Sequence, residues 1–180
     1  MGEFIALLRG INVGRAKRIK MADLRELVEG LGHQDVRTLL SSGNVIFRAA
    51  RGRAGALAQA IQDSLAGELG IRANVIVITA ADVAAVIREN PLPLLASRQP
   101  SRFLVGFLPR PALLAELEPL AGSAFADERF AVGRKAAYLF CANGVLESQL
   151  LMEFSRLTEG TATTRNWSTV LKLEAALSDI

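Results

Sequence analysis

Apolar and polar positions follow two recurring patterns along the first half of the chain. A short apolar run at residues 4–8 predicts a strand, whereas apolar side chains three and four positions apart at 21–31 predict a helix. The same patterns predict strands at 36–40 and 45–48, a helix at 53–69, a strand at 74–78 and a helix at 79–89. Up to residue 78 the element order is β-α-β-β-α-β, which is the ferredoxin-like split pattern.

A segment at 91–101 that contains Pro91, Pro93 and Pro100 interrupts these patterns and predicts a linker. After it the order recurs, with strands at 103–108, 125–132, 136–141 and 161–164, and helices at 112–121, 147–157 and from 167 onward. We therefore expect an α+β protein made of two ferredoxin-like βαββαβ halves, 1–90 and 102–180. Each half should contain an antiparallel sheet covered by helices, and the repeated order predicts an internal duplication.

Composition places the chain among globular proteins and excludes several kinds of site. Of its 180 residues, 51% are apolar and 22% charged, a balance that excludes intrinsic disorder. One cysteine, Cys141, and one histidine, His33, exclude zinc sites of the usual Cys/His kind, so we expect no metal and no cofactor. The sequence has no apolar run of membrane-spanning length, and its first residues lack a basic region followed by a long apolar core, so we expect no signal peptide. We expect a cytoplasmic protein without a membrane partner.

Positive charge is clustered although the formal net charge is only +3. Residues 9–20 contain five cations and no acid, and Gly10 and Gly14 give this segment unusual backbone freedom. The helix predicted from residue 21 lacks a Ser, Thr, Asp or Asn cap, and a helix start attracts anions rather than cations. The segment therefore predicts an anion site between strand and helix, with a solvated basic loop as the alternative.

Two further segments carry polar groups at places where a ligand could bind. Arg165 stands just before a predicted helix start, and the turn at 41–44 reads Ser-Ser-Gly-Asn. Ordinary helix capping and turn chemistry are the alternatives. We expect one shared pocket between the halves. The residues expected to bind the ligand are Arg9, Asn12, Lys17, Lys20, Ser42, Asn44, Arg165 and Asn166.

Several of these segments together resemble a known family. The similar stretches are Ala-Leu-Leu-Arg-Gly-Ile-Asn-Val-Gly at 6–14, Lys-Met at 20–21, Leu-Arg at 24–25, Asp-Val-Arg-Thr at 35–38, Ser-Gly-Asn-Val at 42–45, Thr-Thr-Arg-Asn-Trp at 163–167 and Thr-Val-Leu-Lys-Leu at 169–173. In combination they resemble domain-of-unknown-function family 1697, a family of uncharacterised bacterial proteins. The resemblance implies an α+β duplication of ferredoxin-like halves and no established activity. Family members often have Gly-Gly at 14–15 and Ser-Lys at 148–149, where this chain has Gly-Arg and Ser-Gln.

Three classes of function are compatible with these observations. The first is a module that binds an anionic ligand, such as a phosphate-bearing small molecule, a nucleotide or RNA. The second is an enzyme acting on a phosphorylated or carboxylated small molecule, with Asp23, Glu26 or Asp35 as the base. The third is a structural module whose basic loop meets an acidic partner. His33, between a helix and a strand, is expected to shield the edge of the core rather than to catalyse.

Overall fold

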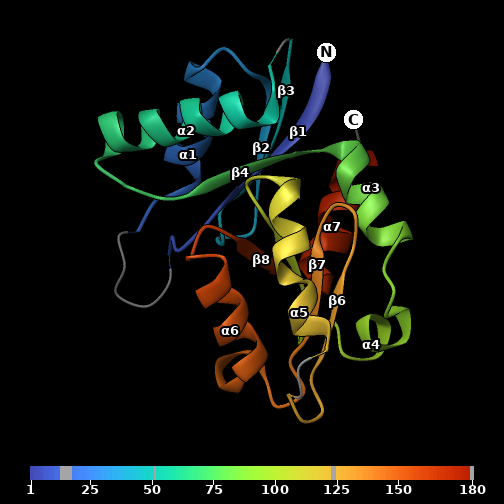
Figure 1. Cartoon of the computed structure of the whole chain (residues 1–180). Coiled ribbons are helices and arrows are strands. Elements are labelled where there is room, and N and C mark those ends of the chain that lie inside the picture. Colours follow the sequence, from blue (N-terminus) through green and yellow to red (C-terminus); the bar gives the residue numbers. More distant parts are fainter. Residues whose placement is uncertain (13–17, 51, 123–124, 179–180) are drawn as a thin grey trace. The chain divides into compact units, whose positions relative to one another are not determined.

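The computed structural model describes residues 1–12, 18–50, 52–122 and 125–178 (Figure 1). The chain divides into two compact units, an N-terminal unit of Met1–Ala80 and a C-terminal unit of Ala81–Ile180. Each unit contains a four-stranded antiparallel sheet packed with helices. The protein is therefore of the mixed α+β class, as the sequence predicts.

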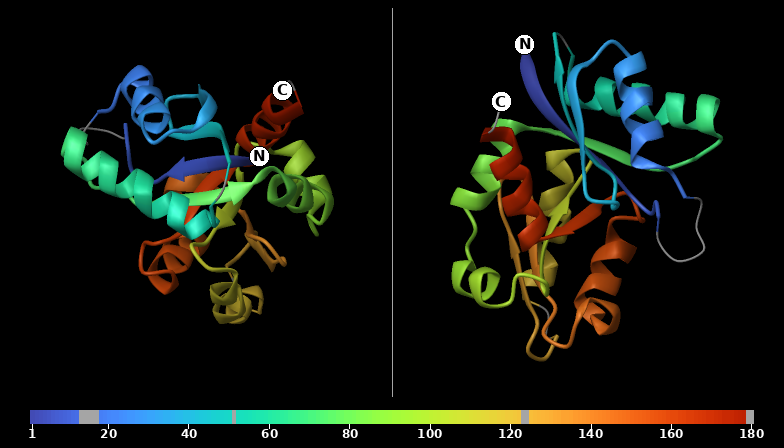
Figure 2. Two further views of the ribbon diagram at one scale, coloured as in Figure 1. Left: turned by 90° about the horizontal axis from the view of Figure 1, so that it is seen from above. Right: turned by 180° about the vertical axis from the view of Figure 1, so that it is seen from behind.

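In the N-terminal unit two helices pack on one sheet. The elements are β1 (Gly2–Leu8), α1 (Met21–Gly30), β2 (Gln34–Leu39), β3 (Asn44–Ala49), α2 (Ala54–Leu69) and β4 (Val75–Thr79), and the strand order is β2-β3-β1-β4. Figure 2 shows α1 and α2 on the same face of this sheet. Leu24 of α1 and Ile61 of α2, both 0% exposed, share a core with Phe47 of β3. Burial of these apolar stripes is the main stabilising term for both helices.

β1 lies in the middle of this sheet and pairs antiparallel with β3 on one side and β4 on the other. Phe4, Ala6 and Leu8 face the core formed with α1 and α2. Ile5 and Leu7 point to the opposite face and are also 0% exposed. Because both faces of β1 are buried from Phe4 to Leu8, this stretch is an apolar run without polar alternation.

The C-terminal unit has the same strand arrangement with extra helices. Its elements are α3 (Ala80–Arg88), α4 (Pro93–Arg98), β5 (Phe103–Phe107), the 3₁₀ helix η1 (Pro111–Leu117), α5 (Glu118–Ala121), β6 (Arg129–Val132), β7 (Ala137–Phe140), the 3₁₀ helix η2 (Val145–Glu147), α6 (Gln149–Leu157), β8 (Thr163–Asn166) and α7 (Trp167–Ser178). The strand order is β6-β7-β5-β8. By element order β5 corresponds to β1, α6 to α2 and β8 to β4, as an internal duplication predicts.

Both faces of the C-terminal sheet are covered. On one face Leu104 and Leu139 pack with residues of η1, α5 and α6. On the other face the indole of Trp167 meets the ring of Phe103 edge-on at 5.6 Å. The Tyr138 hydroxyl donates to the Val86 carbonyl at 2.8 Å, and burial raises the pKa of this phenol to about 12. This bond fastens α3 to the sheet.

The segment predicted as one helix at 112–121 is instead η1 followed by the short helix α5. Pro119 accounts for the break, because it has no N–H group to donate to the carbonyl of Ala115, four residues earlier. Since an α-helical ladder cannot pass this point, the preceding turns tighten to 3₁₀ geometry. The prediction of one continuous helix was wrong, although Leu114 and Leu117 pack inward as expected.

Two strands of the C-terminal unit begin later than predicted. β6 is delayed because Ala126 adopts a left-handed conformation (φ 51°) and the Glu128 N–H donates to the Phe125 carbonyl in a turn. β8 is delayed because the Thr161 N–H donates to the Thr158 carbonyl. In both cases a turn uses backbone groups that a strand ladder requires.

Residues 91–101, predicted as a linker, contain the short helix α4. The Leu92 N–H donates to Asn90 Oδ1 at 2.9 Å, just before Pro93. Proline is well tolerated in the first turn of a helix, because the N–H group it lacks has no partner there. The boundary between the two units lies at Ala80, before α3. That residues 91–101 connect two separately folding halves stays a prediction.

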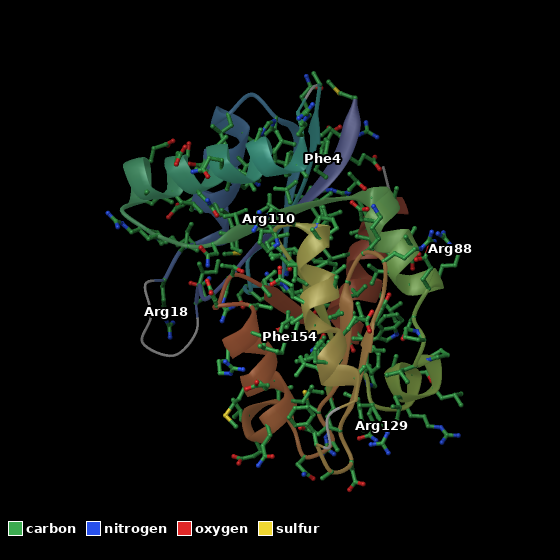
Figure 3. The ribbon with its side chains drawn as sticks, in the orientation of Figure 1. Phe4, Arg18, Arg88, Arg110, Arg129 and Phe154 are labelled. Carbon is green, nitrogen blue, oxygen red and sulfur yellow. The ribbon has the colours of Figure 1, made fainter. Side chains whose placement is uncertain are left out.

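We predict that Gly106→Ala destabilises the protein by about 1–3 kcal/mol through overpacking. A Cβ at Gly106 of β5 would lie 2.6 Å from Cζ of Phe154, which points from α6 onto the sheet (Figure 3). Urea unfolding measures the change. Gly67→Ala in α2 is the control, because no atom lies within 4 Å of its added Cβ and it should stabilise by about 0.5–1 kcal/mol. If Gly106→Ala lowers the free energy of unfolding as much in a Phe154→Leu background as in the wild type, the overpacking explanation is wrong.

Candidate functional site

The end of β1 and the start of β4 place two arginines at one corner of the N-terminal sheet. Leu8 of β1 pairs with Val75 of β4, and the Arg9 N–H donates to the Asn74 carbonyl at 2.9 Å. Arg9 follows β1 directly, and Arg72 precedes β4 by three positions. Both arginines line an open groove of about 570 Å³, which we call the β1–β4 groove. Its volume is within the range of small-molecule sites.

Helix α2 forms the other wall of the β1–β4 groove. Gln59, Gln62, Asp63 and Ala66 line it, and their spacing of three and four places them on one stripe of the helix, beside its buried face. The Val75 N–H donates to Gln62 Oε1 at 2.8 Å, which ties the helix to the start of β4. The groove is therefore held by secondary structure on both sides.

The charge of the β1–β4 groove is positive. Arg9 and Arg72 supply two guanidinium groups, and Asp63 supplies one carboxylate. Gln59 Nε2 donates to Asp63 Oδ1 at 2.8 Å, so an amide already engages this carboxylate. The Gln62 amino group and Asn74 add hydrogen-bonding capacity to the walls. Such a groove suits an anion that carries several acceptor oxygens.

Asn12 holds the loop between β1 and α1, on the side of β1 that faces β3 rather than the β1–β4 groove. Its Nδ2 group donates to the carbonyls of Ile19 and Ser41, each at 3.0 Å, and its Oδ1 accepts from the Ile19 N–H at 2.8 Å. Both amide hydrogens are used in these bonds, and the backbone is left-handed, with φ 55°. Asn12 therefore connects the two ends of the basic loop at residues 9–20, through Ile19, and bonds to Ser41 in the turn at 41–44.

The turn at 41–44 is fixed by close packing and by the side chain of Asn44. A Cβ at Gly43 would lie 2.6 Å from Cδ1 of Ile11, so only glycine fits at this position. Asn44 is 0% exposed, and its Nδ2 donates to the Leu39 carbonyl at 2.8 Å and to Ser42 Oγ at 3.0 Å. The structure thus brings Asn12, Ser42 and Asn44 to the β3 side of β1, whereas Arg9 lies on the β4 side.

Lys20 is the N-cap residue of α1 and makes no capping bond with its side chain. Asp23 is the only acid in the first turn of this helix. This confirms the unusual charge at the helix start, where cations are unfavourable. Arg18, labelled in Figure 3, and Lys20 are exposed, and neither lines the β1–β4 groove. Lys17 lies outside the described residues.

Arg165 and Asn166 belong to the C-terminal unit, in β8. Arg165 pairs with Val105 and is only 8% exposed, and Nη1 of its side chain donates to Thr163 Oγ1 at 3.0 Å and to the Thr164 carbonyl at 2.9 Å. Burial lowers the pKa of this guanidinium to about 10, so it keeps its charge at neutral pH. Asn166 Oδ1 accepts from the Thr169 N–H at 2.9 Å, as in a helix cap. A pocket shared between the halves stays a prediction.

The carboxylates considered as catalytic bases do not line the β1–β4 groove. Asp23 and Glu26 are exposed on α1, and Asp35 Oδ2 accepts from Nη1 of Arg48 at 3.2 Å. Asp63 is the carboxylate that does line it. Across the described ranges no three His, Cys, Asp or Glu side chains group to hold a metal ion. No helix in the part of the chain with assigned structure is long and apolar enough to cross a membrane.

His33 packs on the core of the N-terminal unit. Its ring lies 4.7 Å from that of Phe47, between centroids, and its Nε2 atom is buried without a hydrogen-bond partner among the described residues. Burial lowers the pKa of the imidazole. The expectation that His33 shields the edge of the core therefore agrees with its position in the structure.

Sequence reasoning missed Arg72 and the polar stripe of α2. The signal for Arg72 was available, because the β-α-β-β-α-β pattern places the first and last strands side by side, and Arg9 and Arg72 flank their adjacent ends. For α2, the signal was the spacing of three and four residues between Gln59, Gln62 and Asp63, which places these polar side chains on one side of the helix. What could not be read from the sequence is that this stripe lines a groove beside the ends of β1 and β4.

We predict that Asn12→Ala destabilises the protein by about 1–3 kcal/mol, because three hydrogen bonds are lost and alanine is strained at positive φ. Asn12→Gly loses the same bonds without the backbone strain, so it should be about 1 kcal/mol more stable than Asn12→Ala. Urea unfolding of both variants separates the two effects. Asn143→Ala, at an exposed position, serves as the control. Wild-type stability in Asn12→Ala would rule out this stabilising role of Asn12.

We predict that His33 makes stability depend on pH. Because the pKa of His33 is lower in the folded state, folding favours the neutral ring. Its contribution is then full above the ordinary pKa of about 6.5 and declines as the pH falls towards the folded value. His33→Phe keeps a ring against Phe47 but cannot titrate. The urea midpoint of the wild type should therefore fall relative to that of His33→Phe between pH 7 and 5. Parallel pH profiles for the two proteins would contradict this role.

Comparison with known proteins identifies the family. Residues 1–138 match the family described as "Protein of unknown function (DUF1697)", which confirms the resemblance seen in the sequence, although the motif at 163–167 lies beyond the matched residues. No curated protein matches the chain. A similar solved structure is that of the conserved bacterial protein SP0830 from Streptococcus pneumoniae, with a TM-score of 0.79, 23% identity and 99% of each chain covered. At this identity the likeness shows a shared fold. With most of its length matched, the chain belongs to the DUF1697 family.

Proposed function

We propose that the N-terminal unit binds a small anionic ligand, such as a phosphate-bearing metabolite or a mononucleotide, in the β1–β4 groove. One observation carries this proposal: Arg9 and Arg72, from segments far apart in the sequence, line the same groove. A guanidinium offers paired N–H donors that match phosphate or carboxylate oxygens, and two of them bind a doubly charged group better than one. The groove volume of about 570 Å³ suits a ligand of this size.

The surroundings of the groove give the other polar residues distinct roles in the proposal. Asn74 and the Gln62 amino group supply directional hydrogen bonds to a bound anion. Asn12 and Asn44 keep the loops at the end of β1 in place instead of contacting the ligand, since their amides are engaged in backbone bonds. Lys17 and Lys20 of the basic loop raise the positive potential that draws an anion to this unit.

Isothermal titration calorimetry with inorganic phosphate, pyrophosphate and AMP tests the proposal. Arg72→Gln and Arg9→Gln should each weaken binding at least tenfold, because each removes a charged donor pair. Arg25→Gln is the matched control, since Arg25 is exposed on α1, pairs with Glu29 at 3.6 Å and does not line the groove. It removes the same charge and should change affinity less than twofold.

Two results would overturn the proposal. The first is the absence of binding by all three anions at low salt, where electrostatic attraction is strongest. The second is an equal loss of affinity in Arg25→Gln and Arg72→Gln, which would indicate attraction by net charge alone. A single-stranded RNA oligonucleotide in the same panel separates the alternatives. If it binds much more tightly than AMP, with a steep salt dependence, the ligand is nucleic acid rather than a mononucleotide.

A further inference from the structure

The C-terminal unit has a second groove at the corner that corresponds to the β1–β4 groove. Phe107 of β5 pairs with Thr163 of β8, just as the end of β1 pairs with the start of β4. An open groove of about 310 Å³ lies beyond these strand ends and is walled by η1 and the end of α6. We call it the β5–β8 groove. Its volume is at the lower end of the range for small-molecule sites.

The charges in the β5–β8 groove differ from those in the N-terminal unit. Arg110, labelled in Figure 3, precedes η1 and contributes one guanidinium, whereas Glu116 and Glu159 contribute two carboxylates. All three side chains are exposed, and none makes an ion pair within the described structure. Opposite charges thus line one groove without pairing with each other, and a molecule that carries both charges would complement them.

The other walls of this groove suit a compact ligand with an apolar middle. Leu113, Leu117 and Leu157 line it, so carbon atoms of a ligand can be buried between the charged groups. Leu157 is the last residue of α6, and the C-terminus of a helix has a partial negative charge that favours a cation. The end of this helix therefore favours a cation near the α6 side of the groove.

Glu159 adopts a backbone conformation that is unfavourable for its side chain. Its φ is 49°, and Gly160 follows with φ 67°. At the corresponding helix end of the N-terminal unit, the left-handed residue is a glycine, Gly70, with φ 62°. Residues with a side chain rarely adopt this region, and such strain is concentrated at functional sites. Glu159, which adopts this conformation, is one of the residues that line the groove.

We propose that the β5–β8 groove binds a small zwitterion of the amino-acid type, with an aliphatic chain between or beside its charged groups. Glu116 and Glu159 hold the ammonium group, Arg110 binds the carboxylate and the three leucines contact the aliphatic part. This site is independent of the anion site of the N-terminal unit. It depends on neither Arg9 nor Arg72.

Three probes test the charge requirements in the full-length protein, with L-leucine as the zwitterion. Leucinamide lacks the carboxylate and 4-methylpentanoate lacks the ammonium group, while all three share the aliphatic chain. Binding is followed by backbone amide chemical shifts in NMR titrations. L-leucine should bind at least tenfold more tightly than either of the others, with the largest shifts around Glu159 and Thr161.

Charge-removing variants assign the two ends of the ligand. Glu159→Gln should weaken L-leucine and leucinamide at least tenfold and leave 4-methylpentanoate unchanged, whereas Arg110→Gln should weaken L-leucine and 4-methylpentanoate and leave leucinamide unchanged. Glu147→Gln, at an exposed site that does not line the groove, is the control and should leave all three unchanged. The proposal is overturned if L-leucine shows no binding at any concentration from 20 times that of the protein up to its solubility limit. Binding that neither groove variant weakens also overturns it.

Glu159→Gly separates a ligand-binding role from a structural one. Because glycine adopts positive φ without strain, this variant should unfold at a higher urea concentration than the wild type while losing L-leucine binding. If Glu159→Gly is less stable than the wild type, the side chain of Glu159 stabilises the folded protein and the proposed reason for its strained backbone is wrong.

Discussion

The pairing of the first strand of each unit with neighbours on both sides is the constraint on which this structure depends. β1 lies between β3 and β4, and β5 between β7 and β8, so residues 4–7 of β1 and 104–106 of β5 pair with a strand on each side. Both faces of the central strands are also buried: Ile5 and Val105 are 0% exposed, and Leu8 is 1% exposed. A charged side chain within either strand would lose its hydration. Charge is therefore absent from the buried stretches of these strands: β1 has one charged residue, Glu3 near its start, and the first charged residues after the two strands are Arg9 and Arg110.

The corner beyond each central strand is a natural place for a ligand. There the paired strands end, and a helix that packs on the sheet forms one wall of the groove. This helix is α2 in the N-terminal unit and α6 in the C-terminal unit. The scaffold of both corners is fixed by apolar packing, whereas the residues that line them lie mostly on loops and on the solvent side of helices. Those residues can change without disturbing the core. The two grooves accordingly share their position in the fold but differ in charge.

Motif residues that resemble ligand donors in the sequence can serve the backbone instead. Asn12 and Asn44 are the clearest cases, because their amides bind carbonyl groups of neighbouring loops. Both hold the loops on the β3 side of the end of β1. The number of hydrogen bonds that a side-chain amide already makes indicates how much of its bonding capacity is left for a ligand.

The sequence alone determined the fold class, the order of the elements along most of the chain and most of the apolar stripe that α1 and α2 bury. These follow from local periodicity, because apolar residues such as Leu24 and Ile61 recur at the spacing of the structure they form. It also determined that α1 begins with a cation and without a capping side chain, because the identity of the N-cap residue, Lys20, can be read directly from the sequence. One of its errors lies where a single backbone group decides, at Pro119, whose missing N–H ends a helical ladder.

Only the tertiary structure decided which polar residues meet. Arg9 and Arg72 are separated by most of a unit in sequence, and their common groove depends on the register between β1 and β4 and on the stripe that α2 turns towards them. Such contacts depend on how elements pack, and no local pattern encodes that packing. The same holds for the separation of Asn12 from Arg9, which lie three residues apart but on opposite sides of one strand end. Sequence reasoning could group these residues by chemistry, but their positions follow from strand pairing.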